Sequence, residues 1–229
     1  MTLLAIDTSM TACSAALLRA GAAGPVQRFE PMERGHAEAI FPMIEAVMAE
    51  AGCRFADLTR IAVTVGPGSF TGVRAGVAAA RGLAVAAGLP VIGVNSLEVM
   101  ARGCLRRLGN EEGGFAIAHD AKRGEFYVQH FAGDGAPLSE PQIMDLAQAA
   151  ASIPASVALI AGSGAAAIAE EAGRRGREIR ALFPVLLPEA GDLALIASAR
   201  EPDARPPAPL YLRPADAKPQ TDKSLARAG

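Results

Sequence analysis

The chain has 229 residues and a mass of 23.4 kDa, which allows one large domain or two small ones. Apolar residues make up 51% and charged residues 20%, a composition that is typical of a folded globular protein and excludes a disordered chain. The 22 lysines and arginines are balanced by 24 acidic residues, which excludes nucleic-acid binding through bulk positive charge alone. The absence of tryptophan and the 4% content of aromatic residues disfavour a stacking platform for single strands.

Cysteine usage and hydropathy indicate a cytoplasmic protein. Cys13, Cys53 and Cys104 are an odd number without CxxC spacing, so we expect buried thiols in a reducing compartment rather than disulfides or a zinc site. The residues after Met1 lack the basic stretch and the long apolar stretch of a signal peptide. No apolar run reaches the roughly 18–20 residues that span a bilayer, so we expect no membrane segment.

The first half of the chain predicts a mixed α/β unit that opens with a β-hairpin. Short apolar runs predict its strands at residues 3–6, 13–18, 26–30, 61–65 and 91–94. Helical periodicity predicts two long helices over residues 38–51 and 71–87, and Ser96 is a candidate cap for a third. Because Pro42 lies early in the first helix, that helix either begins near Glu38 or is kinked.

A charged, glycine-rich stretch at residues 102–114 predicts a domain boundary, which separates an N-terminal lobe (residues 1–105) from a C-terminal lobe (residues 106–229). The second lobe also opens with a strand, a turn and a strand, so the two units share a layout. Its predicted elements are strands at 115–118, 125–131 and 158–161, a helix ending near 172, a helix at 192–199, an extended proline-rich segment at 202–209 and a frayed tail at 219–229.

Three short motifs can serve either a ligand or the fold itself. Residues 7–9, Asp-Thr-Ser, end a strand, where they can receive a metal-bound phosphate or simply form the turn. Residues 66–69, Gly-Pro-Gly-Ser, precede a helix and can bind an anion or make a tight turn, although their spacing matches neither a P-loop nor the dinucleotide fingerprint. Residues 160–164, Ile-Ala-Gly-Ser-Gly, can admit a ribose or connect a strand to a helix.

The histidines indicate no metal centre. His36, His119 and His130 have no mutual spacing typical of metal ligands. His119 and Asp120, at a strand end, can perform acid–base work or form an exposed turn. No catalytic triad is legible.

The helix over residues 71–87 is apolar nearly all round, which predicts burial on two sides. Arg74 and Arg81 lie two turns apart on it, with Val77 and Ala78 between them. An apolar helix of small residues with an arginine rim suits a protein–protein interface, and the alternative is packing within its own domain.

Five segments, in this order, resemble the TsaB (YeaZ) family. They are Leu-Ala-Ile-Asp-Thr-Ser at 4–9, His36 with Pro42, Gly-Pro-Gly-Ser-Phe-Thr-Gly-Val-Arg at 66–74, Asp-Ala-Lys-Arg-Gly-Glu-Phe-Tyr at 120–127 and Pro-Leu-Tyr-Leu-Arg at 209–213. The resemblance covers nearly the whole chain and implies the two-lobed actin-like (ASKHA) fold, each lobe a mixed sheet flanked by helices. It implies a non-catalytic dimerisation subunit of the complex that forms N6-threonylcarbamoyladenosine at position 37 of ANN-decoding tRNAs, with no cofactor, no metal and no protease activity.

The resemblance also implies partners and sites. The implied partners are the catalytic subunit TsaD, TsaE bound to the TsaB–TsaD pair, TsaC as a functional link, and a second copy of the chain when TsaD is absent; tRNA is contacted only through the complex. The implied interface lies on the helices of the first lobe, at His36, Ile40, Ile44, Val47, Phe70, Arg74, Val77, Ala78 and Arg81. A vestigial nucleotide cleft is implied at Asp7, Thr8, Ser9, Gly68, Gly162 and Gly164.

One departure concerns catalysis. TsaD carries two metal-binding histidines four residues apart, and the similar stretch here, residues 94–100, has Ser96 and Met100 in their places. Because a hydroxyl and a thioether cannot replace two imidazoles for iron or zinc, we expect a partner rather than an enzyme. Two alternatives stay open. The first is a nucleotide-binding kinase or transferase of the same superfamily, and the second is direct tRNA binding through Arg102, Arg106 and Arg107 or through Arg174, Arg175 and Arg177.

Overall fold

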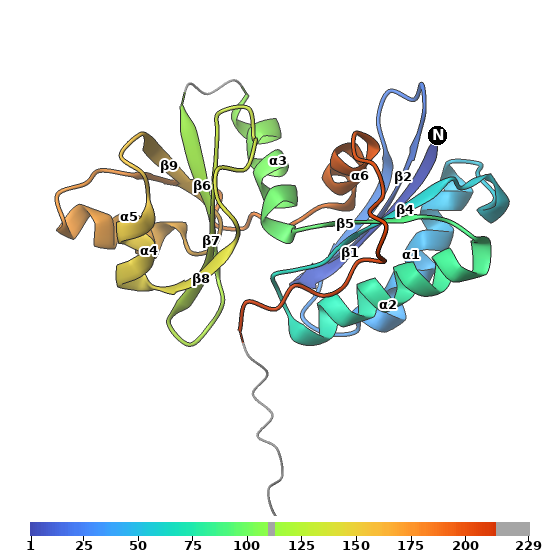
Figure 1. Ribbon diagram of the computed structural model, residues 1–229, viewed down its shortest axis with the longest axis horizontal. Helices are drawn as coiled ribbons and strands as arrows, with labels where there is room; N and C mark the ends of the chain where they lie inside the picture. Colours follow the sequence, from blue (N-terminus) through green and yellow to red (C-terminus); the bar gives the residue numbers. More distant parts are fainter. Residues whose placement is uncertain (110–112, 214–229) are drawn as a thin grey trace, which may run out of the picture.

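The computed structural model describes residues 1–109 and 113–213, which form two α/β lobes side by side (Figure 1). Each lobe is built on a five-stranded mixed sheet, with the strand orders β3-β2-β1-β4-β5 and β10-β9-β6-β7-β8. In both sheets the first strand is central. It pairs antiparallel with the second strand and parallel with the fourth. The two lobes therefore repeat one topology, as the shared layout of the two sequence halves predicts.

The elements of the first lobe match the predicted ones closely. Its strands are β1 (Thr2–Met10), β2 (Ala12–Arg19), β3 (Val26–Pro31), β4 (Arg60–Thr64) and β5 (Val91–Val94). Its helices are α1 (His36–Glu50) and α2 (Phe70–Ala87), with a short 3-10 turn, η1 (Phe55–Asp57). Helix α1 begins at His36 rather than near Glu38, and it contains Pro42.

The second lobe contains three elements that the sequence pattern does not reveal: β8, α4 and β10. The strands are β6 (Gly114–Asp120), β7 (Glu125–Phe131), β8 (Gln142–Asp145), β9 (Val157–Ala161) and β10 (Arg180–Leu182). The helices are α4 (Leu146–Ser152) and α5 (Ala165–Arg174). Residues 202–209 form neither helix nor strand, in line with their predicted extended state. The predicted tail at 219–229 lies outside the described residues.

Strand β1 is buried on both of its faces because side chains alternate across a strand. Leu4 and Ile6 belong to the apolar cluster that α1 and α2 share with the sheet. Leu3 and Ala5 point to the opposite face, where they pack with α6 (Ala190–Ser198). The continuous apolar run at the start of the sequence therefore supplies both layers of the first lobe.

Two helices are exchanged between the lobes. Helix α3 (Ser96–Leu108) follows the first sheet but packs against β6 and β7 of the second, and α6 follows the second sheet but packs against β1 and β2 of the first. The predicted boundary at residue 105 lies inside α3, and the assignment of residues 106–229 to one lobe does not hold for α6. The reason is burial: Leu193, Ala194 and Ala197 cover the otherwise open face of the first sheet.

The cap of α3 differs from the predicted one. The side chain of Asn95 accepts a hydrogen bond from the amide of Glu98 at 2.9 Å and therefore caps the helix. Ser96 is the first helical residue and is fully buried. Asparagine and serine are equally good caps, so the choice between these neighbours depends on the tertiary position of the helix.

Candidate functional site

The start of α2 covers the end of β1. The amide of Ser69 donates to the carbonyl of Ser9 at 2.7 Å, and the Thr8 hydroxyl donates to the carbonyl of Gly72 at 2.7 Å. A Cβ atom on Gly68 would lie 2.0 Å from the Ser9 carbonyl oxygen, and one on Gly72 would lie 2.1 Å from that of Thr8. The glycines of this segment therefore permit backbone contact, and Asp7, Thr8 and Ser9 are buried beneath it.

The carboxyl group of Asp7 is used inside the lobe. Its Oδ1 atom accepts hydrogen bonds from the Ser9 amide at 3.2 Å, the Ser9 hydroxyl at 2.7 Å and the Thr64 hydroxyl at 2.5 Å. Burial nevertheless raises the pKa of Asp7 to about 6, against the opposing effect of these bonds. The hydroxyl groups that could receive a phosphate at this position already serve the fold.

The glycine motif of the second lobe is closed in a similar way. The amide of Gly164 donates to the carbonyl of Ala118 at 3.1 Å. A Cβ atom on Gly162 would lie 2.2 Å from that same carbonyl oxygen, and one on Gly164 would lie 2.6 Å from the Phe126 ring. Residues 162–164 thus connect β9 to α5 by packing on β6, rather than by leaving room for a ribose.

A cavity of about 660 Å³ lies between the lobes. Of the residues expected in a nucleotide cleft, only Gly68 lines it; Asp7, Thr8, Ser9, Gly162 and Gly164 do not. The residues of the cleft prediction are therefore not brought together around one space. The cavity is lined instead by residues that include His36, Phe70, His119, Tyr127, Tyr211 and Arg213.

Two of the three histidines face this cavity. His36 Nε2 lies 2.8 Å from the Met10 carbonyl oxygen, an acceptor, so this nitrogen carries the proton. His119 Nδ1 lies 3.1 Å from the Ser163 hydroxyl, and burial lowers the pKa of His119 to about 4, which keeps it neutral at pH 7. His130 is buried in β7, and no group of three potential metal ligands occurs within residues 1–109 and 113–213.

The structure divides the predicted interface residues into two sets. Four of them lie in the core of the first lobe and expose at most 3% of their surface: Ile40, Ile44, Val47 and Val77. Phe70, Arg74, Ala78 and Arg81 are exposed, and His36 is half-buried. The four core residues therefore pack against the sheet under α1 and α2, and only the other five have surface to offer a partner.

Two exposed residues extend this surface beyond the predicted set. Val85 continues the row of Arg74, Ala78 and Arg81 along α2 at helical spacing, and it is 86% exposed. Phe41 on α1 is 47% exposed, although its place in the apolar pattern predicts a core position. The spacing of Val85 could have revealed the row, whereas the packing of α1 on the sheet decides the position of Phe41.

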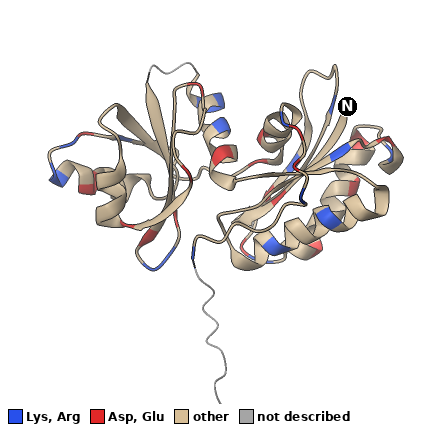
Figure 2. Cartoon of the chain, viewed as in Figure 1, with Lys and Arg blue, Asp and Glu red and all other residues tan. Residues whose placement is uncertain are grey.

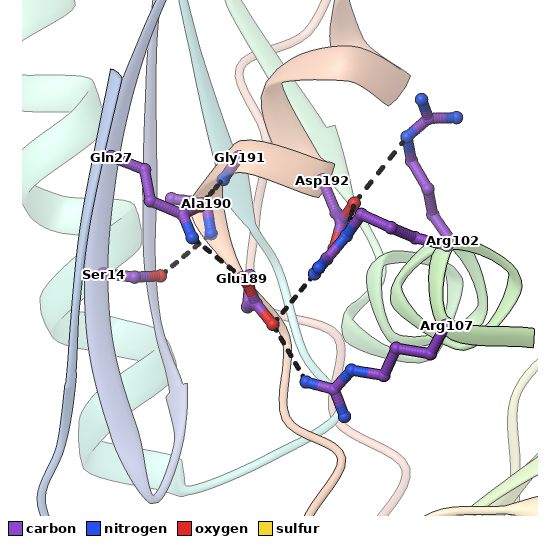
Figure 3. Close-up of polar contacts among 9 residues, drawn as sticks. Ser14, Gln27, Arg102, Arg107, Glu189, Ala190, Gly191 and Asp192 are labelled. Carbon is purple, nitrogen blue, oxygen red and sulfur yellow. Dashed lines mark hydrogen bonds and ion pairs between the residues drawn. The ribbon is translucent and has the colours of Figure 1, made fainter. Parts of the chain in front are cut away.

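The basic clusters of the sequence are engaged in internal contacts. Arg106 binds Asp192 through two hydrogen bonds of 2.9 and 3.2 Å, and Arg102 and Arg107 reach Asp192 and Glu189 at the start of α6 (Figure 3). The second cluster is also occupied: Arg174 and Arg175 pair with Glu170 and Glu171, and Arg177 donates to backbone carbonyls of residues 153–157. Acidic and basic residues accordingly occur together on α3 and on α5 (Figure 2).

The start of α6 is also tied to the first sheet. The amide of Ala190 donates to the Ser14 hydroxyl at 3.0 Å, and the amide of Gly191 donates to Gln27 at 2.8 Å (Figure 3). Gln27 in turn donates to Glu189 at 3.0 Å. The same helix end therefore joins the first sheet to the arginines of α3, which holds the two lobes together.

Two lobes of one topology around a central cleft define a two-lobed actin-like fold, in which the glycine segments at residues 66–72 and 162–164 pack on the first strand of their own sheets. A model of the family described as "TsaD: tRNA N6-adenosine threonylcarbamoyltransferase" matches residues 30–187. YeaZ from Pseudomonas aeruginosa superposes with a TM-score of 0.74 at 32% identity, covering 86% of this chain and 92% of that one. The chain belongs to this family, and within it to the TsaB (YeaZ) branch.

Two further relatives support the same placement. A Pseudomonas aeruginosa structure described as an uncharacterized protein with similarity to peptidase YEAZ gives a TM-score of 0.80 at 32% identity, covering 93% of this chain and 99% of that one. The tRNA threonylcarbamoyladenosine biosynthesis protein TsaB of Escherichia coli is 41% identical over 134 residues, which are 58% of this chain. The match spans 56% of the Escherichia coli protein, about half its length.

The segment that would hold a metal in TsaD does not fit one here. Ser96 and Met100 replace the two imidazoles, and both are fully buried at the start of α3. Met100 belongs to the apolar cluster between α3 and the second sheet. A hydroxyl and a thioether in such surroundings are poor ligands for iron or zinc.

No helix of the described chain is long and apolar enough to cross a bilayer.

Proposed function

We propose that this chain is a non-catalytic, cytoplasmic subunit that binds and supports a TsaD-type transferase in forming N6-threonylcarbamoyladenosine at position 37 of ANN-decoding tRNAs. The names of its relatives in Escherichia coli and Haemophilus influenzae support a role in tRNA threonylcarbamoyladenosine biosynthesis. The observation that carries the non-catalytic role is the packing of Gly68 and Gly72 against Ser9 and Thr8. This contact occupies the loop where the fold family would place a phosphate.

The partner surface is the exposed side of α1 and α2. Along the row, arginine alternates with apolar residues, as Arg74, Ala78, Arg81 and Val85, and arginine is enriched at interfaces. Phe41 on α1 adds a half-exposed aromatic ring. A stable interface of standard size buries about 1,600 Å² in total, and two helix surfaces can provide that area together.

The same surface serves a second copy of the chain when the transferase is absent. Two copies and the transferase then compete for one face of α2. TsaE binds the assembled pair, TsaC supplies the activated threonylcarbamoyl group, and tRNA reaches the subunit only through the complex. The engagement of the arginine clusters with internal carboxylates supports this indirect route to tRNA.

The test uses two matched substitutions of exposed apolar residues. Val85→Asp places a carboxylate on the proposed surface, and Leu138→Asp places one on the second lobe, where the side chain is 61% exposed. Light scattering after size-exclusion chromatography should show a homodimer that converts to a one-to-one complex with the transferase. Val85→Asp should weaken both species by about tenfold or more, because an unpaired carboxylate would be desolvated. Leu138→Asp should change neither.

Val77→Asp is unsuitable for this purpose, since Val77 is 3% exposed and its substitution would unfold the lobe. If Val85→Asp leaves transferase binding intact, the interface is misplaced.

A calorimetric titration of the isolated chain with Mg-ATP tests the rival enzyme function. Micromolar binding would contradict the non-catalytic proposal, because the closed loops leave no phosphate site.

A further inference from the structure

A C-terminal strap, residues 207–213, crosses from one lobe to the other (Figure 1). On the first lobe, the amide of Leu210 donates to the Val65 carbonyl at 2.7 Å. On the second lobe, Arg213 pairs with the Glu125 carboxylate and donates to the Ala121 carbonyl at 3.2 Å. The strap is therefore attached at both ends, and Tyr211 lies between the two attachments.

Tyr211 is placed against the first turn of α2. Its ring centroid lies 5.4 Å from that of Phe70, and its hydroxyl accepts a hydrogen bond from Arg74 Nε at 2.9 Å. The Arg74 guanidinium also lies over the Phe70 ring, at 4.1 Å from the centroid. Phe70 and Tyr211 are each 48% exposed. Residues separated by 137 positions thus form one aromatic and cationic cluster on the surface.

The cationic group of this cluster is not paired with a carboxylate. Within the part of the chain that the structure describes, Arg74 has no carboxylate partner, unlike Arg102, Arg106 and Arg107. Its Nε atom donates to Tyr211 and its guanidinium lies over the Phe70 ring, so the guanidinium plane is restricted on an exposed residue. A guanidinium in a fixed plane is suited to bind a carboxylate with two parallel hydrogen bonds.

We propose that Phe70, Arg74 and Tyr211 form one recognition surface for a partner segment that presents a carboxylate beside an apolar side chain. The inference rests on the proposed function in naming the transferase subunit as the source of that segment. Tyrosine and arginine are enriched among the few residues that dominate the binding energy of interfaces, and phenylalanine is enriched in interface composition. Here the apolar side chain packs on the two rings, and the carboxylate pairs with Arg74.

Arg213 acts as a positioning residue for this surface. Its hydrogen bonds and its ion pair go to Ala121, Lys122 and Glu125, and they anchor the strap that carries Tyr211 to the second lobe. With this anchor removed, Tyr211 must be ordered during binding, and that ordering costs affinity. Partner affinity therefore depends on Arg213 and its contacts with the second lobe, although the α1–α2 surface belongs to the first lobe.

The test measures transferase binding to the full chain and its variants by calorimetry, at low and high salt. Arg74→Gln and Tyr211→Ala should each weaken binding by about tenfold, and Arg74→Gln should also reduce the salt dependence. Arg213→Gln should weaken binding by about threefold or more through lost pre-organisation. Arg205→Gln, an exposed substitution in the same C-terminal segment, is the matched control and should bind like the wild type.

Hydrogen exchange on the isolated chain distinguishes a change in the order of the strap from a change in partner contacts. Arg213→Gln should speed exchange of the Leu210 amide by about tenfold, and Arg205→Gln should not. If the wild type binds but Arg74→Gln and Tyr211→Ala bind equally well, this inference is overturned and the proposed function stands. Unchanged or tighter binding by Arg213→Gln overturns its positioning role. A wild-type chain that does not bind the transferase overturns the proposed function itself.

Discussion

The two lobes share a strand order but close the end of their first strand in different ways. At the end of β1, the backbone of α2 lies directly on Thr8 and Ser9, which are buried. At the end of β6, His119 and Asp120 stay partly exposed and line the central cavity, where the Ser163 hydroxyl holds them. One topology thus produces a sealed loop in one lobe and a partly open one in the other.

The difference follows from glycine placement. Gly68, Gly72 and Gly76 recur every four residues and form a side-chain-free stripe, so α2 can touch β1. A Cβ atom on Gly76 would lie 2.4 Å from the Thr8 hydroxyl oxygen. Helix α5 of the second lobe begins after Gly164 and contacts its sheet through alanine and isoleucine side chains. Topology therefore sets where each helix begins, and the glycine stripe lets the backbone of α2 reach β1, whereas α5 packs on its sheet through side chains.

The largest expected effect breaks the sealed loop. Gly72→Ala places a Cβ atom 2.1 Å from the Thr8 carbonyl oxygen, which is backbone and cannot move aside. We expect a loss of about 3–5 kcal/mol in the free energy of unfolding, measured by chemical denaturation. In the second lobe, Gly164→Ala meets the edge of the Phe126 ring, which can shift, so its cost should be about 1–2 kcal/mol.

The control for this prediction is Gly82→Ala in the same helix. No atom lies within 4 Å of the position that its Cβ would take. The substitution should stabilise the protein by about 0.5–1 kcal/mol, the ordinary gain of alanine over glycine in a helix. If Gly72→Ala stabilises the protein as much as Gly82→Ala does, helix propensity alone determines the effect, and the contact with β1 does not require a glycine at position 72.

The second prediction compares the titratable groups at the two strand ends. The raised pKa of Asp7, about 6 against 3.8, means that its contribution to stability is lost as the pH rises from about 4 to 6, on the order of 3 kcal/mol. The lowered pKa of His119, about 4 against 6.5, means that its contribution is present above pH 6.5 and lost as the pH falls toward 4.

Unfolding measured at several pH values tests these opposite signs. Relative to the wild type, Asp7→Asn should become more stable as the pH rises from 4 to 7, and His119→Gln should become more stable as the pH falls over the same range. Differences from the wild type cancel the contributions of other carboxylates. Burial disfavours the charged form of both groups, so the opposite signs arise because Asp7 is an acid and His119 a base. Parallel pH profiles for the two variants would contradict this account.

The third and smallest effect concerns the contact between the lobes. Asp192 is 3% exposed and binds Arg106 through two hydrogen bonds. Asp192→Ala should cost about 1–3 kcal/mol, because the paired guanidinium loses its buried partner. Glu170→Ala removes an exposed pair with Arg174 and should cost less than about 0.5 kcal/mol. Equal costs, measured by denaturation, would show that the pair at the start of α6 does not join the lobes.

The sequence by itself determined the local elements and the family. The apolar runs predicted the strands of the first lobe and the opening hairpin of the second, because alternation and β-branching act over a few residues. The segment at 66–74 indicated the family, which the comparisons confirm. The edge strands β8 and β10 were missed because they contain no buried residue and therefore no apolar run, and α4 was missed because it is a helix of only seven residues.

Only the tertiary structure decided which surfaces meet. The pattern of α1 and α2 could not tell core from interface, because both are apolar, and packing on the sheet buried Ile40 while it exposed Phe41. The return of α6 to the first sheet depends on contacts such as Ser14 with Ala190, which are 176 residues apart. Likewise, Tyr211 joins Phe70 and Arg74 only through the path of the strap, since local sequence patterns carry no information about contacts at such separations.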